Sequence, residues 1–264
     1  MKLSMITISY NAEKEIEKTI LSVLRQSVPV YEYILVDGKS SDRTNEIIES
    51  YRQIFQSKNI LFKHISEEDD GISDAFNKGI KIASGELIGL INADDELLVE
   101  TNAILQKDFD EEYDVFYGNC IWVDEINGIK YIRKASSDIS KIRYEMVMIH
   151  PSTFIKKDVY EKYGLYDVNY KYCMDEDLLT RLYENGLKFK YIDEKLTIFR
   201  AGGVSDAGIK RTLREGLRLA LNTEKPEIVK AYYFFIKKTL RYEMSKVLKK
   251  MKLYKFVKKD IEEL

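Results

Sequence analysis

Within the first hundred residues, short apolar runs typical of buried strands alternate with segments of helical periodicity, and this alternation constrains the fold most. Four runs rich in aliphatic residues predict strands at Leu3–Ser9, Tyr33–Val36, Ile60–Ile65 and Leu87–Ile91. Apolar residues recur at helical spacing between them, for example over Ser73–Ala83. Such alternation is typical of a mostly parallel sheet covered by helices on both faces. The sequence therefore predicts an α/β fold.

After Asp95 the pattern changes. Residues Val115–Asp124 and Ile129–Arg133, joined through Asn127-Gly128, predict a hairpin, because Asn-Gly is a frequent turn pair. We expect one α/β domain over residues 1–204 and a helical C-terminal extension over 205–264. Within these parts we expect two further helices and two short strands, at about 156–163, 176–185, 188–192 and 196–200.

The composition excludes several classes of protein. With 264 residues, 45% of them hydrophobic, the chain is long and apolar enough for one large domain with a packed core. Its two cysteines, Cys120 and Cys173, cannot make a disulfide framework, and no Cys/His spacing typical of a metal site occurs. The longest charge-free stretches have ten residues, too few to cross a bilayer, and the N-terminus lacks the pattern of a signal peptide. We therefore expect a cytoplasmic protein.

The net charge of −2 conceals an uneven distribution. Residues 230–260 contain eleven Lys and Arg against Glu243 and Asp260, a net charge of +9, and aromatic and aliphatic residues are interleaved with them. A cationic amphipathic helix of this kind can lie on an anionic membrane surface, which is the partner we predict. A solvated helix packed on the body and a dimerisation helix are the alternatives. Nucleic acid is not expected, because the rest of the chain is acidic and carries no nucleic-acid-binding motif.

Acidic residues follow most of the predicted parallel strands. In open parallel sheets, ligands bind at the carboxyl ends of the strands. Carboxylates there suit a metal ion or hydrogen bonds to a sugar or base, whereas the phosphate-binding loops GxGxxG and GxxxxGK[ST] are absent. The four strand ends are Ser9-Tyr10-Asn11, Asp37-Gly38, Glu68-Asp69-Asp70-Gly71 and Asn92-Ala93-Asp94-Asp95.

At this point the chain resembles the family 2 glycosyltransferases, which are inverting, nucleotide-sugar-dependent enzymes of bacterial type with the GT-A fold. Lys39 and Arg43 depart mildly from the family pattern, since Gly is common at both positions, and Met174 stands where Glu, Ala or Ser often precedes the base. The resemblance implies a nucleotide-binding part at about 1–96 and an acceptor part at about 97–204. The segments that carry it are ITISYNAEKEIEKTILSVLRQS, ILVDGKSSDRTNEII, SEEDDGISDAFNKGIKIASGELIGLINADDEL and MDEDLLTRL.

The segment Asn92-Ala93-Asp94-Asp95 matches the family's metal-binding acidic motif. The resemblance implies that Asp95 binds Mg²⁺ or Mn²⁺, while Asp94 contacts the ribose of the donor or shares the metal. A divalent cation there would neutralise the charge that develops on a departing diphosphate. From the residues alone, either acid could instead cap a helix that begins near Leu97.

The resemblance also implies residues around the nucleotide-sugar. Asp37 lies in the family's first acidic motif and Asp70 in the loop around the nucleotide, where a carboxylate can accept the imide N–H of uracil or thymine. Lys78 belongs to a motif that borders the pocket, with a solvated helix charge as the alternative. Tyr10 could stack on the base or belong to the edge of the core. Arg200 lies in a loop that would close over the diphosphate, with an ordinary connection as the alternative.

The catalytic base is predicted at the start of the helix that carries Asp175-Glu176-Asp177. Inversion is a single displacement, so one carboxylate must take the proton of the acceptor hydroxyl. By resemblance this is Asp175, with Asp177 as the rival or as an acceptor-side residue. The helix dipole also favours acids in a first turn, whatever the chemistry. His150 resembles a residue that lines the acceptor region, although a lone histidine is often structural.

We therefore predict an inverting, metal-dependent glycosyltransferase that uses a nucleoside-diphosphate sugar, in the first place a UDP-sugar. The expected acceptor is a glycan or a lipid-linked glycan of a surface polysaccharide or O-antigen, which fits a peripheral position on the inner face of the cell membrane. One alternative is a nucleotidyltransferase, although its glycine-rich loop is missing after the first strand. The other alternative is a non-catalytic sugar- or nucleotide-binding protein, which the intact acids disfavour. A homodimer is left open.

Overall fold

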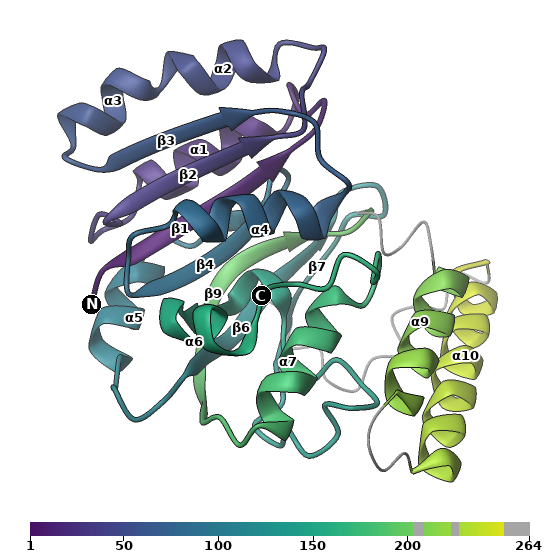
Figure 1. The fold of residues 1–264 in the computed structure, drawn as a ribbon. Helices are drawn as coiled ribbons and strands as arrows, with labels where there is room; N and C mark the ends of the chain where they lie inside the picture. The colour runs from purple at the N-terminus through teal and green to yellow at the C-terminus, as the bar shows by residue number, and fades with distance from the viewer. Residues whose placement is uncertain (203–208, 223–226, 251–264) are drawn as a thin grey trace.

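The computed structural model describes residues 1–202, 209–222 and 227–250. Four parallel strands form one half of its sheet, in the order β3-β2-β1-β4 (Figure 1). Their central pairs are hydrophobic and fully buried, as Ile6 beside Ile34 illustrates. Parallel pairing aligns their carboxyl ends at one edge of the sheet. The four strands are β1 (Leu3–Ser9), β2 (Glu32–Asp37), β3 (Leu61–Ser66) and β4 (Leu87–Asn92).

The other half of the sheet is mixed. After β4 the order continues β8-β6-β9-β5, and β7 pairs with β6. β8 is antiparallel to both β4 and β6, whereas β6 and β9 are parallel. The predicted hairpin is confirmed as β6 and β7. The bounds are β5 (Glu96–Leu97), β6 (Val115–Asp124), β7 (Ile129–Arg133), β8 (Thr153–Lys156) and β9 (Phe189–Arg200).

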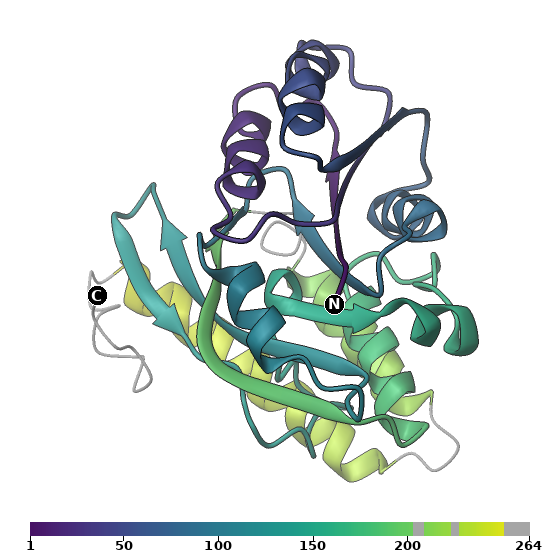
Figure 2. The same ribbon diagram turned by 90° about the vertical axis from the view of Figure 1, so that its left-hand side faces the viewer.

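Helices cover both faces of the sheet (Figures 1 and 2). Alternate strand residues explain the two layers: Ile6 and Ile8 belong to one core cluster, whereas Leu3 and Met5 belong to the other. The first cluster includes residues of α4 (Ile72–Ile82), α6 (Lys157–Tyr163) and α7 (Met174–Glu184). The second includes residues of α1 (Ile16–Leu24), α2 (Thr44–Ser50), α3 (Arg52–Ser57) and α5 (Thr101–Asp108). The predicted α/β class is confirmed.

Two expectations about local structure are wrong. The two short strands near 188–192 and 196–200 form the single strand β9, whose pairing with β6 shifts register on both sides of Asn119. This shift lets the strand continue through its polar middle. Likewise, no helix begins near Leu97, because Glu96–Leu97 form β5 and α5 starts only at Thr101. The alternative in which Asp94 or Asp95 caps a helix is therefore excluded.

The C-terminal part contains two helices, α9 (Ile209–Leu221) and α10 (Ile228–Lys250), which lie beside each other next to α7 (Figure 1). The predicted helical character is confirmed for these residues. Leu219 of α9 belongs to the same core cluster as Leu178 of α7, so the pair is packed onto the body. The predicted domain boundary at 204 lies outside the described residues. Among the described helices, none is long and apolar enough to cross a membrane.

Candidate active site

Two loops at the carboxyl edge of the sheet are fastened to each other. The loop after β1 turns at Asn11, whose φ of 48° lies in the left-handed region that asparagine tolerates better than most residues. The Asn11 side-chain oxygen accepts the N–H of Ser41 at 2.9 Å, and the N–H of Ala12 donates to the Thr44 hydroxyl at 2.8 Å. These bonds join the ends of β1 and β2, where two of the predicted nucleotide-binding residues lie.

Asp37, at the end of β2, is buried and organises the loop that follows. Its carboxylate accepts the hydroxyls of Ser9 at 3.0 Å and Ser66 at 2.9 Å. Asn45 donates its side-chain amide at 2.9 Å, and Ser40 donates both its N–H and its hydroxyl. Burial raises the pKa of Asp37, but these donors outweigh burial and hold the pKa below its usual value. A nucleobase would have to displace one of these hydrogen-bond donors from Asp37. Recognition of the nucleobase by Asp37 therefore stays a prediction.

Asp69, rather than Asp70, lies against Gly38, which Tyr10 also approaches. A Cβ atom at Gly38 would lie 2.6 Å from Asp69 Oδ2 and 3.4 Å from the Tyr10 ring, so the lack of a side chain at Gly38 lets both residues lie close to its backbone. Tyr10 is 70% exposed, and its ring is therefore accessible for stacking. Asp70 is exposed to solvent. Asp69 is not among the residues predicted from the sequence, although it belongs to the same strand-end segment as Asp70.

Lys78 and Asn77, neighbours on α4, have different partners. Lys78 Nζ lies 3.1 Å from Glu67 and 3.3 Å from Asp74, so this lysine neutralises acids near the start of α4. Its contact with a nucleotide stays a prediction. Asn77 is buried, and its side chain both donates to the Tyr166 carbonyl at 2.9 Å and accepts the Tyr166 N–H at 3.0 Å. Asn77 thereby ties α4 to the segment that precedes α7.

Asp94 and Asp95 follow β4 in a turn and are held differently. Asp95 is fully buried, and its carboxyl accepts the backbone N–H of Arg200 at 2.9 Å and the Asn92 amide at 3.3 Å. Burial, together with the Asp94 charge, raises the pKa of Asp95 to about 8. Asp94 is half-buried, and burial raises its pKa too. Within the described residues, the Asp94 carboxyl accepts a hydrogen bond from its own backbone N–H only.

This pair of carboxyl groups fits a divalent cation. Burial raises both pKa values, and the Asp94 charge raises that of Asp95 further, so the donors of the protein do not compensate two negative charges there. Among the described residues, the Asp94 carboxyl has no hydrogen-bond donor beyond its own backbone N–H, while Asp95 is fixed by its hydrogen bonds. In the described parts of the chain, no group of three or more His, Cys, Asp or Glu side chains could hold a metal ion. Two carboxylates are nevertheless sufficient for Mg²⁺, which commonly completes its shell with water and substrate phosphates.

Arg200, at the end of β9, is bound to the turn that carries these acids. Its guanidinium donates to Glu96, to Glu125 at 3.2 Å and to the Asp94 carbonyl at 2.9 Å. The side chain thus fastens β9 to the end of β4. Contact with a diphosphate would require another conformation and stays a prediction. Of the glycines in the predicted closing loop, Gly202 has a φ of 105°, and residues 203–205 lie outside the described residues.

The start of α7 lies at the same edge of the sheet. Ser73, in the first turn of α4, donates to the Tyr170 carbonyl at 3.2 Å and contacts Met174 Sδ at 3.0 Å. Since α4 begins shortly after the carboxyl end of β3, these contacts bring the first turn of α7 to the edge where Asp94 lies.

The two candidate bases on α7 have different partners. Asp177 Oδ2 accepts the Nε–H of Arg181 at 2.9 Å, and the same guanidinium donates to two carbonyls within residues 163–165. Asp177 therefore belongs to a structural link. Asp175 is half-buried and accepts the N–H of Glu176 at 2.9 Å, and burial raises its pKa. This arrangement favours Asp175 over Asp177 as a base.

His150, in the short helix η1 (His150–Ser152), packs among aromatic side chains. Its ring lies 5.4 Å from that of Phe76, and its Nε2 atom lies 3.4 Å from the Tyr166 hydroxyl. Burial lowers the pKa of His150 to about 4, so the imidazole is neutral at pH 7. A neutral imidazole can exchange hydrogen bonds with a sugar, and the acceptor-side role of His150 and Asp177 stays a prediction.

Comparison with known proteins yields one family and several relatives. The family model described as Glycosyl transferase family 2 matches residues 4–168. TuaG of Bacillus subtilis (strain 168), named for teichuronic acid biosynthesis, is 38% identical over 94 residues, so the match spans about a third of either chain (36%). The PGL/p-HBAD biosynthesis glycosyltransferase of Mycobacterium bovis (strain BCG / Pasteur 1173P2) is 23% identical over 231 residues, which cover 83% of this chain and 88% of the relative.

Solved structures show the same fold. TarS 1-349 of S. aureus in complex with UDP matches with a TM-score of 0.64 at 21% identity, covering 92% of this chain and 72% of that one. The mannosyltransferase PcManGT from Pyrobaculum calidifontis in complex with GDP-Man and Mn²⁺ matches with a TM-score of 0.66 at 16% identity, covering 89% and 69%. The predicted GT-A fold is thus confirmed.

Proposed function

The chain belongs to glycosyl transferase family 2, and from this premise we propose that it transfers a sugar from a nucleoside-diphosphate sugar to an acceptor hydroxyl with inversion at the anomeric carbon. We propose a UDP-sugar as donor, since TarS was solved with UDP and with UDP-GlcNAc. The named relatives serve teichuronic acid and PGL/p-HBAD biosynthesis. We therefore propose a surface glycan, free or lipid-linked, as the acceptor.

One observation carries this proposal: candidate groups for both halves of the reaction lie at one edge of the sheet. Tyr10, Asp69 and Asp94 follow the carboxyl ends of β1, β3 and β4. The turn that carries Asp175 is held against the start of α4 at the same edge. A single displacement on a nucleotide-sugar needs groups that bind the nucleotide, a cation beside the diphosphate and a base for the acceptor hydroxyl. Tyr10 and Asp69, the pair Asp94 and Asp95, and Asp175 are the candidates for these three tasks.

On the donor side, we assign the nucleobase to a position beside Tyr10 and Asp69, which both lie next to Gly38. Tyr10 would stack on the ring, and the Asp69 carboxylate would accept the imide N–H that uracil carries. Asp94 and Asp95 would hold the divalent cation, which when bound supplies positive charge beside the departing diphosphate.

On the acceptor side, Asp175 is assigned as the general base. Its carboxylate takes the proton of the acceptor hydroxyl while the hydroxyl oxygen forms a bond to the anomeric carbon. The bond from that carbon to the diphosphate oxygen breaks in the same step, and its electron pair leaves with the diphosphate. A single displacement of this kind inverts the configuration, so the product of a UDP-α-sugar is a β-glycoside.

A nucleotide panel tests the proposed function. UDP with Mn²⁺ is expected to raise the Tm of the chain by about 5 °C at saturation, more than GDP, dTDP or CMP does. Incubation of a matching UDP-sugar with glycan acceptors should then release UDP and yield the inverted glycoside, measured by NMR of the anomeric proton. Binding without hydrolysis or transfer across donors and acceptors would instead support the non-catalytic alternative, and a retained configuration would contradict the mechanism.

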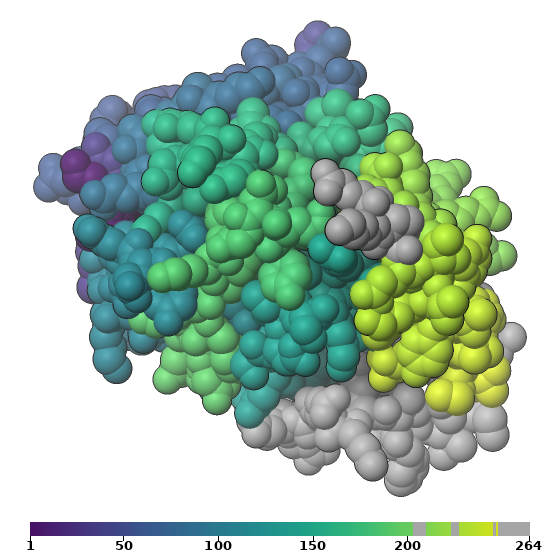
Figure 3. All heavy atoms as spheres, turned by 60° about the horizontal axis from the view of Figure 1, so that its bottom comes forward, coloured from purple at the N-terminus to yellow at the C-terminus, as the bar shows by residue number. Residues whose placement is uncertain are grey.

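We also propose that α10 docks on an anionic membrane surface. Lys237 pairs with Glu145 at 3.0 Å and Lys238 with Glu176 at 3.3 Å, so these two lysines face the body. Apolar side chains that are at least 47% exposed recur along α10 at helical spacing: Val229, Tyr232, Tyr233, Ile236, Leu240, Met244 and Val247. Figure 3 shows α10 on the surface of the molecule. Such a stripe, in the segment of charge +9, suits insertion between anionic headgroups.

Substitution of the stripe tests this docking. The double variant Ile236→Ser/Leu240→Ser should weaken co-sedimentation with phosphatidylglycerol vesicles by about tenfold or more, because two apolar side chains no longer leave water. The control is Ile126→Ser, which removes a 94% exposed isoleucine far from α10 in sequence and should leave co-sedimentation unchanged. If the double variant binds vesicles normally but shifts a dimer to a monomer in light scattering, α10 is a dimerisation helix and the membrane proposal is wrong.

A further inference from the structure

The loop before Asp175 is bound by a residue far along the chain. Glu215, in the middle of α9, accepts the backbone N–H groups of Lys171 at 3.2 Å, Tyr172 at 2.7 Å and Cys173 at 3.2 Å. The three amides are consecutive and end two residues before Asp175. Hydrogen bonds from N–H groups to a carboxylate are stronger than those between neutral groups. Three of them to one carboxylate therefore restrain the backbone of this short loop.

Further contacts of α9 surround this loop. The Cys173 thiol donates to the Thr212 carbonyl at 3.3 Å, and the Arg218 guanidinium lies 5.4 Å from the centre of the Tyr170 ring. Gly216 lies beside the same turn, since a Cβ there would be in ordinary van der Waals contact with Glu176 Oε2, at 3.5 Å. The helix therefore contacts residues on both sides of Asp175.

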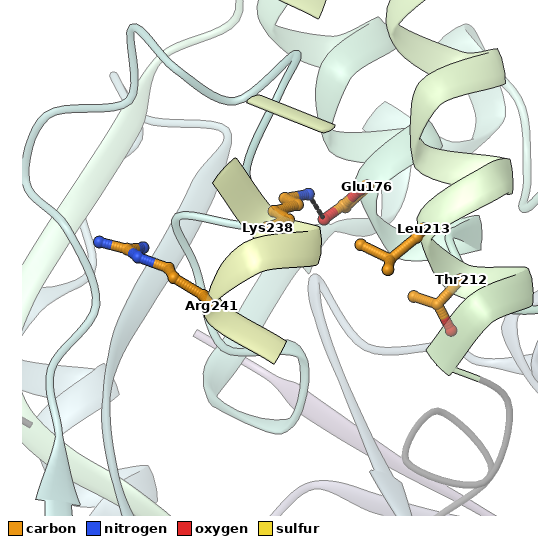
Figure 4. A pocket seen from close by; sticks show the side chains of 5 residues that line it. All are labelled: Glu176, Thr212, Leu213, Lys238 and Arg241. Atoms are coloured by element: carbon orange, nitrogen blue, oxygen red, sulfur yellow. Dashed lines mark hydrogen bonds and ion pairs between the residues drawn. The ribbon is translucent and has the colours of Figure 1, made fainter. Parts of the chain in front are cut away.

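Close packing alone does not hold the loop in place. A cavity of about 290 Å³ remains between the start of α7 and the two C-terminal helices. Figure 4 shows this cavity, with Lys238 of α10 directed at Glu176 across it and Leu213 on the α9 side. The first turn of α7 is packed on its core side, where Cys173 and Met174 are buried, and polar contacts add to this packing on the side of the cavity. Those of Glu215 act on the backbone itself.

We propose that Glu215 is a positioning residue for transfer, which holds residues 171–173 so that the Asp175 carboxylate meets the acceptor hydroxyl at a fixed distance. This inference rests on the proposed function, in which Asp175 is the base. Proton transfer needs donor and acceptor atoms within hydrogen-bond reach, and a displacement of about 1 Å can lower a rate by about 100-fold. Donor binding at the ends of β1, β3 and β4 involves none of these contacts, so Glu215 should affect the chemical step alone.

The variant Glu215→Ala tests this role. It should lower kcat by about 10- to 100-fold while the KM for the nucleotide-sugar changes by less than about twofold. Glu215→Gln keeps one acceptor oxygen and should recover part of kcat. The matched control is Glu145→Ala, which removes the 3.0 Å ion pair to Lys237 that also docks the C-terminal helices, but does not touch residues 171–173. Its kcat should stay near that of the wild type.

Hydrogen exchange reports on the loop without any substrate. The amides of residues 171–173 should exchange faster in Glu215→Ala and at the wild-type rate in Glu145→Ala. Equal kcat for these two variants, or faster exchange with an unchanged kcat, would overturn the positioning role. A fall of kcat and a matching rise of donor KM would also overturn it. A wild-type protein that transfers no sugar would contradict the proposed function instead, and exchange would then decide alone whether Glu215 holds the loop.

Discussion

Asp175→Asn is expected to lower kcat for transfer by about 10³-fold while the Kd for UDP stays within about twofold of the wild type. An amide keeps the size of the side chain but cannot take a proton from the acceptor hydroxyl. UDP would be held by residues at the ends of the parallel strands and not by Asp175, so its affinity should not depend on this charge. Steady-state transfer and isothermal titration with UDP measure the two quantities.

Asp177→Asn on the same helix is the matched control. Its carboxylate is paired with Arg181 at 2.9 Å, so we expect the substitution to lower the Tm of the protein while kcat stays close to the wild-type value. The reverse outcome, with Asp177 essential for kcat and Asp175 dispensable, would contradict the assignment.

The pH dependence of kcat provides a second test of Asp175 as the base. Burial raises the pKa of Asp175, so the carboxyl group keeps its proton at a higher pH than an exposed aspartate does. The base works only when it is ionised. The rate should therefore fall on the acid side through one ionisation above the ordinary range for aspartate, near 3.9. The residual activity of Asp175→Asn should lack this limb.

Asp94→Ala is expected to weaken binding of UDP by about 100-fold in the presence of Mn²⁺, which corresponds to about 2.7 kcal/mol. The reason is that, within the part of the chain that the structure describes, the Asp94 carboxyl accepts only its own backbone N–H, whereas both oxygens of Asp95 accept hydrogen bonds from other residues. In EDTA the wild type and the variant should bind UDP equally weakly. Isothermal titration with and without the metal measures all four affinities.

The control for this variant is Asp108→Ala, which removes a carboxylate at the end of α5 that lies 4.0 Å from Lys190. It should bind UDP like the wild type. Wild-type affinity for UDP that is the same in EDTA and in Mn²⁺ would show that the acids at 94 and 95 do not act through a cation.

Most of the fold could be predicted because burial leaves a clear pattern in the parallel strands. β1 to β4 are found within one residue of the expected bounds at either end. β9 was expected as two strands, because Asp193-Glu194-Lys195 interrupts its apolar pattern. A shift of register beside Asn119 absorbs this interruption, and only the partner strand shows it.

The candidate site was predicted less well, because neighbouring acids cannot be told apart by composition. Asp69 and Asp70 differ only in the direction in which the loop points them, and Asp69 lies beside Gly38. Asp175 and Asp177 could have been separated earlier, since Arg181 stands four residues after Asp177 and such pairs meet on a helix. Glu215 left no signal, because the amides it binds lie more than 40 residues earlier in the chain.

The bonds between α9 and the loop before Asp175 bear on how far the C-terminal end can be shortened. The match with the family model ends at residue 168, whereas Glu215 binds the amides of residues 171–173 from a helix that follows the sheet. Removal of α9 and α10 would leave the acids at the ends of the parallel strands but would take away these three hydrogen bonds. The anchor proposed for Asp175 and the helix proposed to meet the membrane would be lost together.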